Sequence, residues 1–210
     1  MLIVISPEEI IVNEGEIINQ LLSNGLELYH LRKPISVKLE YEEFIKTIPS
    51  KNKRSIVLHQ HHELALRYNV KGLHLKENHR NSLSKQEIKD LKKNLQNRNM
   101  ILSSSFHSLE EIKTYDGLFD YVFLSPVFES ISKPGYVSGS KFRVQGSEVR
   151  KTKIIALGGI QESTVAKAKD LGFDGIAVLG AIWQEPSQAF SRFEAIKREY
   201  EASFKNSTIL

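Results

Sequence analysis

The sequence predicts a single-domain α/β protein built as a closed (β/α)8 barrel, the TIM-barrel fold. Eight short apolar runs alternate with amphipathic helical stretches along the 210 residues. That alternation is typical of a parallel sheet whose strands are connected by helices. The last two predicted strands, 153–157 and 175–179, contain the continuous apolar, β-branched runs 154–157 and 176–179, as expected of strands buried on both faces. The length suits one domain spanning 1–210.

The elements follow one another in strand–helix pairs. Apolar runs predict strands at 2–6, 26–31, 55–58, 72–75, 100–104, 121–124, 153–157 and 175–179. Helical periodicity predicts helices at 8–22, 40–48, 62–68, 85–95, 108–115, 162–171 and 188–200. Ser108 followed by Glu111 is a capping-box signature at a helix start. An open doubly wound sheet is the alternative fold, but no GxGxxG follows the first strand, which disfavours its dinucleotide-binding form.

Two segments lack a clear strand or helix pattern. Residues 128–148 contain Lys133-Pro134-Gly135-Tyr136 and two further glycines, and they predict a long loop after the sixth strand. Loops at this end of barrel strands commonly carry function. The tail 203–210 is expected to fray.

Composition narrows the function classes. The chain has 29 Lys and Arg against 25 acidic residues, a mild excess that suits anionic small molecules and is too weak and too evenly spread for nucleic acid. It has no cysteine, which excludes disulfides, zinc–thiolate sites and a cysteine nucleophile. The apolar run at 1–6 is too short for a signal peptide or a membrane span. We therefore expect a cytoplasmic protein without membrane contact, for which a homodimer is the commonest symmetric assembly.

Glycines at the ends of the last two strands predict a phosphate site. Gly158-Gly159 and Gly180-Ala181 follow these strands and lead into helical patterns. Glycine lets backbone N–H groups approach a ligand closely, and two such turns in succession form an anion cup. In (β/α)8 barrels, phosphate commonly binds after strands seven and eight.

Other strand ends supply cations, hydroxyls and imidazoles. These candidates are Arg32-Lys33 after the second strand, Ser105 and His107 after the fifth, and Ser130, Ser132 and Lys133 in the loop after the sixth. We expect His107 to point into the barrel mouth, where an imidazole can act as general acid or base. His59 and His61 lie two residues apart, but no nearby aspartate completes a ligand set, so hydrogen-bonded histidines are favoured over a metal site.

Several motifs, taken together and in order, resemble the thiamine phosphate synthase/TenI family of (β/α)8 barrels. They are Gly72-Leu73-His74-Leu75, Ser105-Phe106-His107-Ser108-Leu109-Glu110-Glu111, Asp120-Tyr121-Val122 and the two glycine turns. The similarity extends over about residues 2 to 200. The synthase of this family joins a pyrimidine diphosphate to a thiazole phosphate and releases pyrophosphate, whereas the TenI branch is a thiazole tautomerase.

The resemblance implies a role for each matching residue. Arg32 matches the pyrophosphate-binding arginine, and Ser105 matches the family's strand-five serine. Ser130, Ser132 and Lys133 match a Thr-x-Thr-Lys loop. The thiazole phosphate is expected at Gly158, Gly159, Gly180 and Ala181.

Three positions depart from the family. Gln60 and His79 stand where the synthase has its two Mg²⁺-binding aspartates, and neither is the hard anionic oxygen ligand that Mg²⁺ prefers. Pro126 stands where TenI has the histidine proposed for proton transfer. We therefore expect no metal, and no cofactor unless the chain is an active synthase that uses Mg²⁺.

Three functions remain open from the sequence. The first is a TenI-like tautomerase with His107 as acid–base and with Arg32 and Lys133 steering the anion. The second is a working synthase with metal binding rebuilt on His59, His61 or His79. The third is a non-catalytic binder of a thiamine intermediate.

Overall fold

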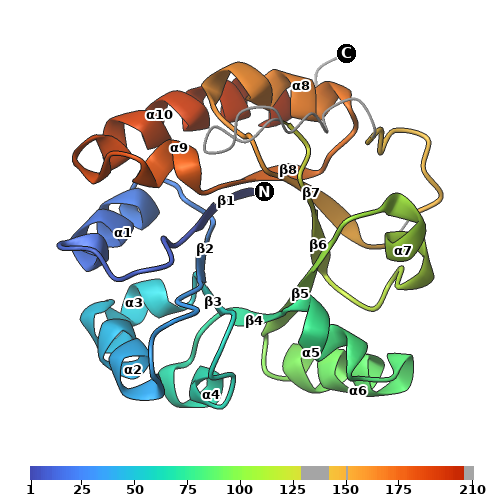
Figure 1. The fold of residues 1–210 in the computed structure, drawn as a ribbon, viewed down its shortest axis with the longest axis horizontal. Coiled ribbons are helices and arrows are strands. Elements are labelled where there is room, and N and C mark those ends of the chain that lie inside the picture. The colour runs from blue at the N-terminus through green and yellow to red at the C-terminus, as the bar shows by residue number, and fades with distance from the viewer. Residues whose placement is uncertain (129–141, 150, 206–210) are drawn as a thin grey trace.

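The strands close into one parallel barrel, which confirms the predicted (β/α)8 fold. The computed structural model describes residues 1–128, 142–149 and 151–205. The strands pair in chain order and β8 returns to β1, all in parallel (Figure 1). They are β1 (Leu2–Ile5), β2 (Leu28–Leu31), β3 (Ile56–Leu58), β4 (Gly72–Leu75), β5 (Ile101–Phe106), β6 (Tyr121–Leu124), β7 (Lys153–Leu157) and β8 (Gly175–Val178). Each lies within, or overlaps, a strand predicted from the sequence.

Alternate residues of each strand point to opposite sides of the barrel wall. One buried cluster fills the barrel interior: Ile3, Ile5, Leu28, Val57, Tyr121, Phe123, Ile155 and Ala177. The residues between them, such as Val4, Leu58 and Val122, belong to the larger cluster beneath the helices. This alternation decides which side chains reach the mouth, because a residue two positions beyond an interior residue points the same way.

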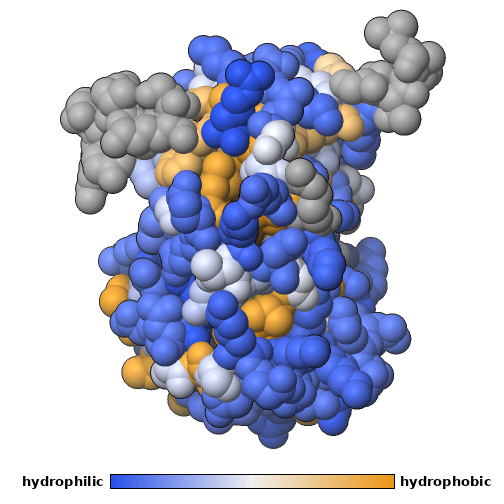
Figure 2. All heavy atoms as spheres, turned by 90° about the vertical axis from the view of Figure 1, so that its right-hand side faces the viewer, coloured by the Kyte–Doolittle hydropathy of each residue, from blue (hydrophilic) through white to orange (hydrophobic). Residues whose placement is uncertain are grey.

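Helices form a ring outside the barrel (Figure 1). They are α1 (Glu14–Ser23), α2 (Lys38–Thr47), α3 (Ser50–Lys53), α4 (Leu64–Tyr68), α5 (Glu77–Asn81), α6 (Lys85–Gln96), α7 (Leu109–Thr114), α8 (Val165–Asp170), α9 (Gly180–Trp183) and α10 (Ala189–Tyr200). The short helices α3 and α5 were not anticipated, because one turn of helix carries too little periodicity to read. The face drawn in Figure 2 is largely hydrophilic, with hydrophobic residues visible mainly in its recesses.

The first helix begins at Glu14, not at residue 8 as predicted. The chain before it folds around the Lys33 ammonium, whose Nζ donates to the carbonyls of Pro7 and Glu9 at 2.9 and 2.7 Å and to Glu14 Oε2 at 2.7 Å. Carbonyls turned toward a buried cation cannot also accept helical hydrogen bonds. The apolar periodicity of 8–13 was therefore misleading.

Two further expectations are refined by the structure. Ser108 does cap α7, accepting from the Glu111 N–H at 3.1 Å, but the Glu111 carboxylate accepts from Arg80 Nη2 at 2.5 Å. The turn Glu201–Lys205 continues α10, so fraying does not begin at residue 203. No helix in the described ranges is both long and apolar enough to cross a membrane.

Candidate active site

A cavity of about 570 Å³ opens at the carboxyl ends of the strands. Each of the eight strands contributes a residue to its lining, either from within the strand or from the segment directly after it. The lining residues are Ile5, Arg32, His59, His74, Lys76, Glu77, Ser105, Phe123, Ser125, Pro126, Leu157, Gly158, Gly159, Ile160, Ala177, Leu179, Gly180 and Ala181. Six sequence candidates, Arg32, Ser105, Gly158, Gly159, Gly180 and Ala181, therefore lie together.

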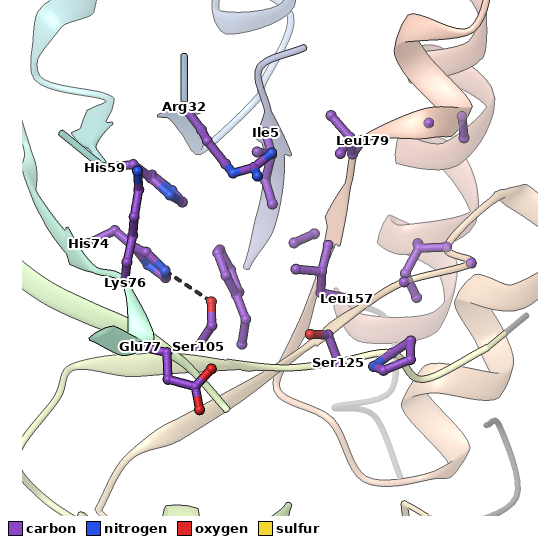
Figure 3. A pocket seen from close by; sticks show the side chains of 18 residues that line it. Ile5, Arg32, His59, His74, Lys76, Glu77, Ser105, Ser125, Leu157 and Leu179 are labelled. Carbon is purple, nitrogen blue, oxygen red and sulfur yellow. Dashed lines mark hydrogen bonds between the residues drawn. The ribbon is translucent and has the colours of Figure 1, made fainter. Parts of the chain in front are cut away.

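Two cations line one side of this cavity, opposite Leu157 and Leu179 (Figure 3). Arg32 and Lys76 each lie two residues beyond an interior histidine, so strand alternation turns both inward. Arg32 also pairs with Glu8, with Nη1 2.6 Å from Oε1. Burial, and then the charge of Arg32, lowers the pKa of Lys76. An anion bound between the two cations would relieve that repulsion.

Lys33 has no part in the cavity, although it adjoins Arg32 in sequence. Its side chain points to the helix layer and is fully buried with Glu14. Desolvation by burial lowers the pKa of Lys33 and raises that of Glu14. The Arg32-Lys33 pair therefore divides into one cavity cation and one structural cation.

The glycine turns lie on the β7–β8 side. Gly158 and Gly159 have φ values of +95° and +63°, a region that favours glycine. A Cβ on Gly158 would lie 2.9 Å from Pro126 Cα and Cβ. Within the described ranges, the N–H groups of Gly158 and Gly159 have no protein acceptor. Gly180 and Ala181 open α9, where first-turn N–H groups have no intrahelical partner.

His107 does not line the cavity, contrary to our expectation that its ring would point into the mouth. Its side chain is 59% exposed at the rim. Nδ1 donates to the Ser125 carbonyl at 2.8 Å, and Nε2 is 4.0 Å from Glu77 Oε2. Both of these partners line the cavity, so the His107 ring lies just outside it. Three other candidates, Ser130, Ser132 and Lys133, lie outside the described residues.

Gln60 and His79, which the resemblance matches to the synthase's Mg²⁺-binding aspartates, do not fit that ion. Gln60 is tied to the Lys33 backbone, with Oε1 accepting from its N–H at 3.0 Å and Nε2 donating to its carbonyl at 2.6 Å. The His79 ring stacks on that of His62, with centroids 5.6 Å apart. Neither residue lines the cavity. Of the described lining residues, Glu77 alone carries a carboxylate, whereas Mg²⁺ prefers several oxygen ligands.

Sequence reasoning missed a cluster of buried histidines at the cavity floor. His30, His59 and His74 are all buried. Burial lowers the pKa of His30 to about 3 and holds the pKa values of His59 and His74 well below their usual range. His61 is not part of the cluster: its ring lies against Tyr41. The signal that points to the cluster is the alternation of strands β2 and β4, on which His30-x-Arg32 and His74-x-Lys76 face inward together.

Fold and cavity together define a (β/α)8-barrel protein with cations and glycine turns around its mouth. The model of the family "Thiamine monophosphate synthase" matches residues 2–182. The chain is 27% identical over 194 residues to a thiamine-phosphate synthase of Lysinibacillus sphaericus, covering 87% of each chain. It therefore belongs to the thiamine monophosphate synthase family, as the sequence motifs indicated.

The chain is also similar to solved structures of thiamine phosphate pyrophosphorylases. A thiamine phosphate pyrophosphorylase from Bacteroides thetaiotaomicron superimposes with a TM-score of 0.73 at 29% identity, covering 95% of this chain and 97% of that one. A second one, from Pyrococcus furiosus, superimposes with a TM-score of 0.75 at 22% identity, covering 96% of each chain. At that identity, the second similarity supports the fold.

Proposed function

We propose that this chain is a thiamine-phosphate synthase, which joins a pyrimidine diphosphate to a thiazole phosphate and releases pyrophosphate. The observation that carries this proposal is the division of the cavity into two anion-attracting sides. Arg32 and Lys76 line one side and the turns at Gly158 and Gly180 line the other. A reaction between two phosphorylated substrates needs two such sides, and the pair of cations Arg32 and Lys76 suits the higher charge of a diphosphate.

The two sides would have different tasks in the reaction. Guanidinium and ammonium groups near the leaving diphosphate would stabilise the negative charge that develops as its carbon–oxygen bond breaks. The glycine N–H groups would hold the thiazole phosphate and orient the thiazole nitrogen toward the same carbon. Because the present residues do not fit Mg²⁺, these protein groups alone are assigned the stabilising charge.

The tautomerase hypothesis has less support. Its proton carrier would be His107, whose ring lies at the rim and is held by the Ser125 carbonyl. Two of the relatives compared carry the name thiamine-phosphate synthase, which favours the transferase. Of the functions left open by the sequence, the proposal therefore keeps the synthase, without the rebuilt metal binding on His59, His61 or His79.

A coupling assay tests the proposal. The full chain is incubated with both substrates, in EDTA and in Mg²⁺, and pyrophosphate and thiamine phosphate are measured. We expect both products in equal amounts, and neither when one substrate is omitted. Isomerisation of the thiazole without coupling would replace the proposal by the tautomerase, and tight binding without any turnover would replace it by the non-catalytic binder.

A further inference from the structure

Three imidazoles converge at the floor of the cavity from neighbouring strands. His30 lies on β2, His59 directly follows β3, and His74 lies on β4. One nitrogen from each lies within 4.8 Å of the other two. The His59 and His74 rings stack with centroids 4.0 Å apart, and Figure 3 shows both rings facing the cavity from the same wall.

Hydroxyl groups hold two of these rings from behind. His30 Nε2 is 2.5 Å from the Tyr121 hydroxyl, and His74 Nδ1 is 2.9 Å from Ser103 Oγ. The other nitrogen of His30 contacts His59 Nε2 at 2.8 Å, and the other nitrogen of His74 contacts Ser105 Oγ at 3.0 Å. Metal-binding histidines are typically fixed in this way, with the second ring nitrogen bonded to a protein group that sets ring orientation and tautomer.

The cluster offers three imidazole nitrogens and no carboxylate. Hard ions such as Mg²⁺ prefer oxygen ligands, whereas neutral imidazole suits Zn²⁺, Co²⁺, Ni²⁺ and Cu²⁺. The three imidazoles therefore favour an ion of the Zn²⁺ type over Mg²⁺, the ion that an active synthase of this family would use.

We propose that His30, His59 and His74 form a binding site for a divalent transition-metal ion of the Zn²⁺ type. His59 and His74 line the cavity, so a fourth coordination position would open toward it. Three histidines with one open position form a ligand set typical of catalytic zinc. The site includes neither Gln60 nor His79, and the inference does not depend on the proposed synthase activity.

Metal binding requires a local rearrangement in which the stacked His59 and His74 rings separate so that both direct a nitrogen at one ion. Zinc–nitrogen bonds of about 2.0–2.1 Å in tetrahedral geometry place ligand atoms roughly 3.3 Å apart. Two bonds would give way: the contact between His30 Nδ1 and His59 Nε2 at 2.8 Å and that between His74 Nε2 and Ser105 Oγ at 3.0 Å. The bonds to Tyr121 and Ser103 can remain. Because Ser105 also lines the cavity, metal binding would release its hydroxyl there.

Titration of the metal-free full chain, without either substrate, tests the site. We expect Zn²⁺ to bind one ion per chain by calorimetry and to raise Tm. Co²⁺ should give the intense visible absorption of a tetrahedral ion, which Zn²⁺ then abolishes. His74→Gln and His59→Gln should weaken binding at least ~100-fold, and Ser103→Ala should weaken it about 10–100-fold through ring orientation.

His79→Gln and His107→Gln are matched controls, because both remove an imidazole outside the cluster and should leave Zn²⁺ affinity unchanged. Circular dichroism establishes that each variant is folded. If a cluster variant fails to fold, the Co²⁺ spectrum of the wild-type chain still decides the question. Absence of one-to-one binding, an octahedral Co²⁺ spectrum, or full affinity in His74→Gln would overturn the proposal. A chain that binds Zn²⁺ but does not couple the substrates would contradict only the synthase.

Discussion

At position 158, both the backbone conformation and the nearby Pro126 require glycine. Its φ of +95° disfavours any side chain, and an added Cβ would lie only 2.9 Å from Pro126. Gly158→Ala should lower stability by roughly 1–3 kcal/mol through overpacking, and should weaken thiazole phosphate binding about tenfold, or about 1.4 kcal/mol. Calorimetry with thiazole phosphate measures the loss. Gly146→Ala is the matched control, since Gly146 has a φ of +83° but nothing within 4 Å of the place a Cβ would take.

Replacing Arg32 should impair use of the pyrimidine diphosphate and leave binding of the thiazole phosphate unchanged. Its guanidinium lines the cavity, with a relative side-chain exposure of 34%. Hydrogen bonds to charged groups contribute about 1.5–3 kcal/mol, so Arg32→Gln should reduce kcat/KM for the pyrimidine diphosphate roughly 10–100-fold. Steady-state coupling kinetics would show this. Arg67→Gln removes an exposed arginine outside the cavity and should leave kcat/KM for the pyrimidine diphosphate unchanged. Equal kcat/KM values for the two variants would argue against an anion site at Arg32.

The candidate residues illustrate what a sequence can reveal at this scale. The glycines after β7 and β8 and Arg32 after β2 were predicted to lie at the barrel mouth, and they line the cavity. Residue type and position at the end of a strand are enough to predict this. His30 and His74 lie inside strands and were overlooked, since a histidine in an apolar run gives no sign of which face it occupies. His107 was misjudged for a related reason: its direction depends on the Ser125 carbonyl, a contact 18 residues away in sequence.

Among the elements, α1 depends most directly on one ion pair. Lys33 Nζ and Glu14 Oε2 are 2.7 Å apart with both side chains fully buried, and Tyr29 donates to Glu14 Oε1 at 2.8 Å. Removing one partner leaves a buried charge unpaired, so Lys33→Met should destabilise the fold by about 3–5 kcal/mol. Urea unfolding measures this. Arg67→Gln, which breaks the more exposed pair with Glu42, should have little effect; similar losses in both would contradict the assignment.

The segment leading into α4 should make stability pH-dependent. Burial lowers the pKa of His62 from 6.5 to about 4. Below pH 6.5 the unfolded chain therefore binds a proton that the folded chain does not, and stability falls with pH until about pH 4. The slope from this group is at most about 1.4 kcal/mol per pH unit. Unfolding of wild type and His62→Gln from pH 7 to pH 5 should show a steeper loss in wild type. A His62→Gln profile parallel to wild type would mean that the buried ring does not titrate as inferred.

At the scale of the whole molecule, the barrel was the part of the structure most open to prediction. Eight alternating strand and helix patterns have few compact arrangements, and sequential parallel pairing with helical crossovers leaves the closed barrel as the consistent one. Details set by contacts between distant segments were not predictable. The start of α1 depends on Lys33, and the second bond of the capping box on α7 is lost because Glu111 is engaged by Arg80.

The two sides of the cavity lead to a prediction about the whole molecule. If each side binds its own anion, inorganic pyrophosphate and thiazole phosphate should each stabilise the folded chain alone. At ~100 times Kd, a ligand adds about 2.7 kcal/mol, and each kcal/mol raises Tm by about 2–4 °C in a chain of this size. The two shifts should add, because the ligands occupy different sides. Thermal melts in EDTA measure both without any metal contribution.

The same melts assign each ligand to its side through two variants. At the same ligand concentration, Arg32→Gln should reduce the shift from pyrophosphate to about half or less and preserve the shift from thiazole phosphate. Gly158→Ala should reduce the shift from thiazole phosphate to about half and preserve the shift from pyrophosphate. Such a crossed pattern cannot arise from general destabilisation, which would reduce both shifts together. If saturating thiazole phosphate instead removes the pyrophosphate shift, the anions compete for one place. A cavity with only one anion place would fit a protein acting on a single phosphorylated thiazole, and the synthase proposal would have to be abandoned.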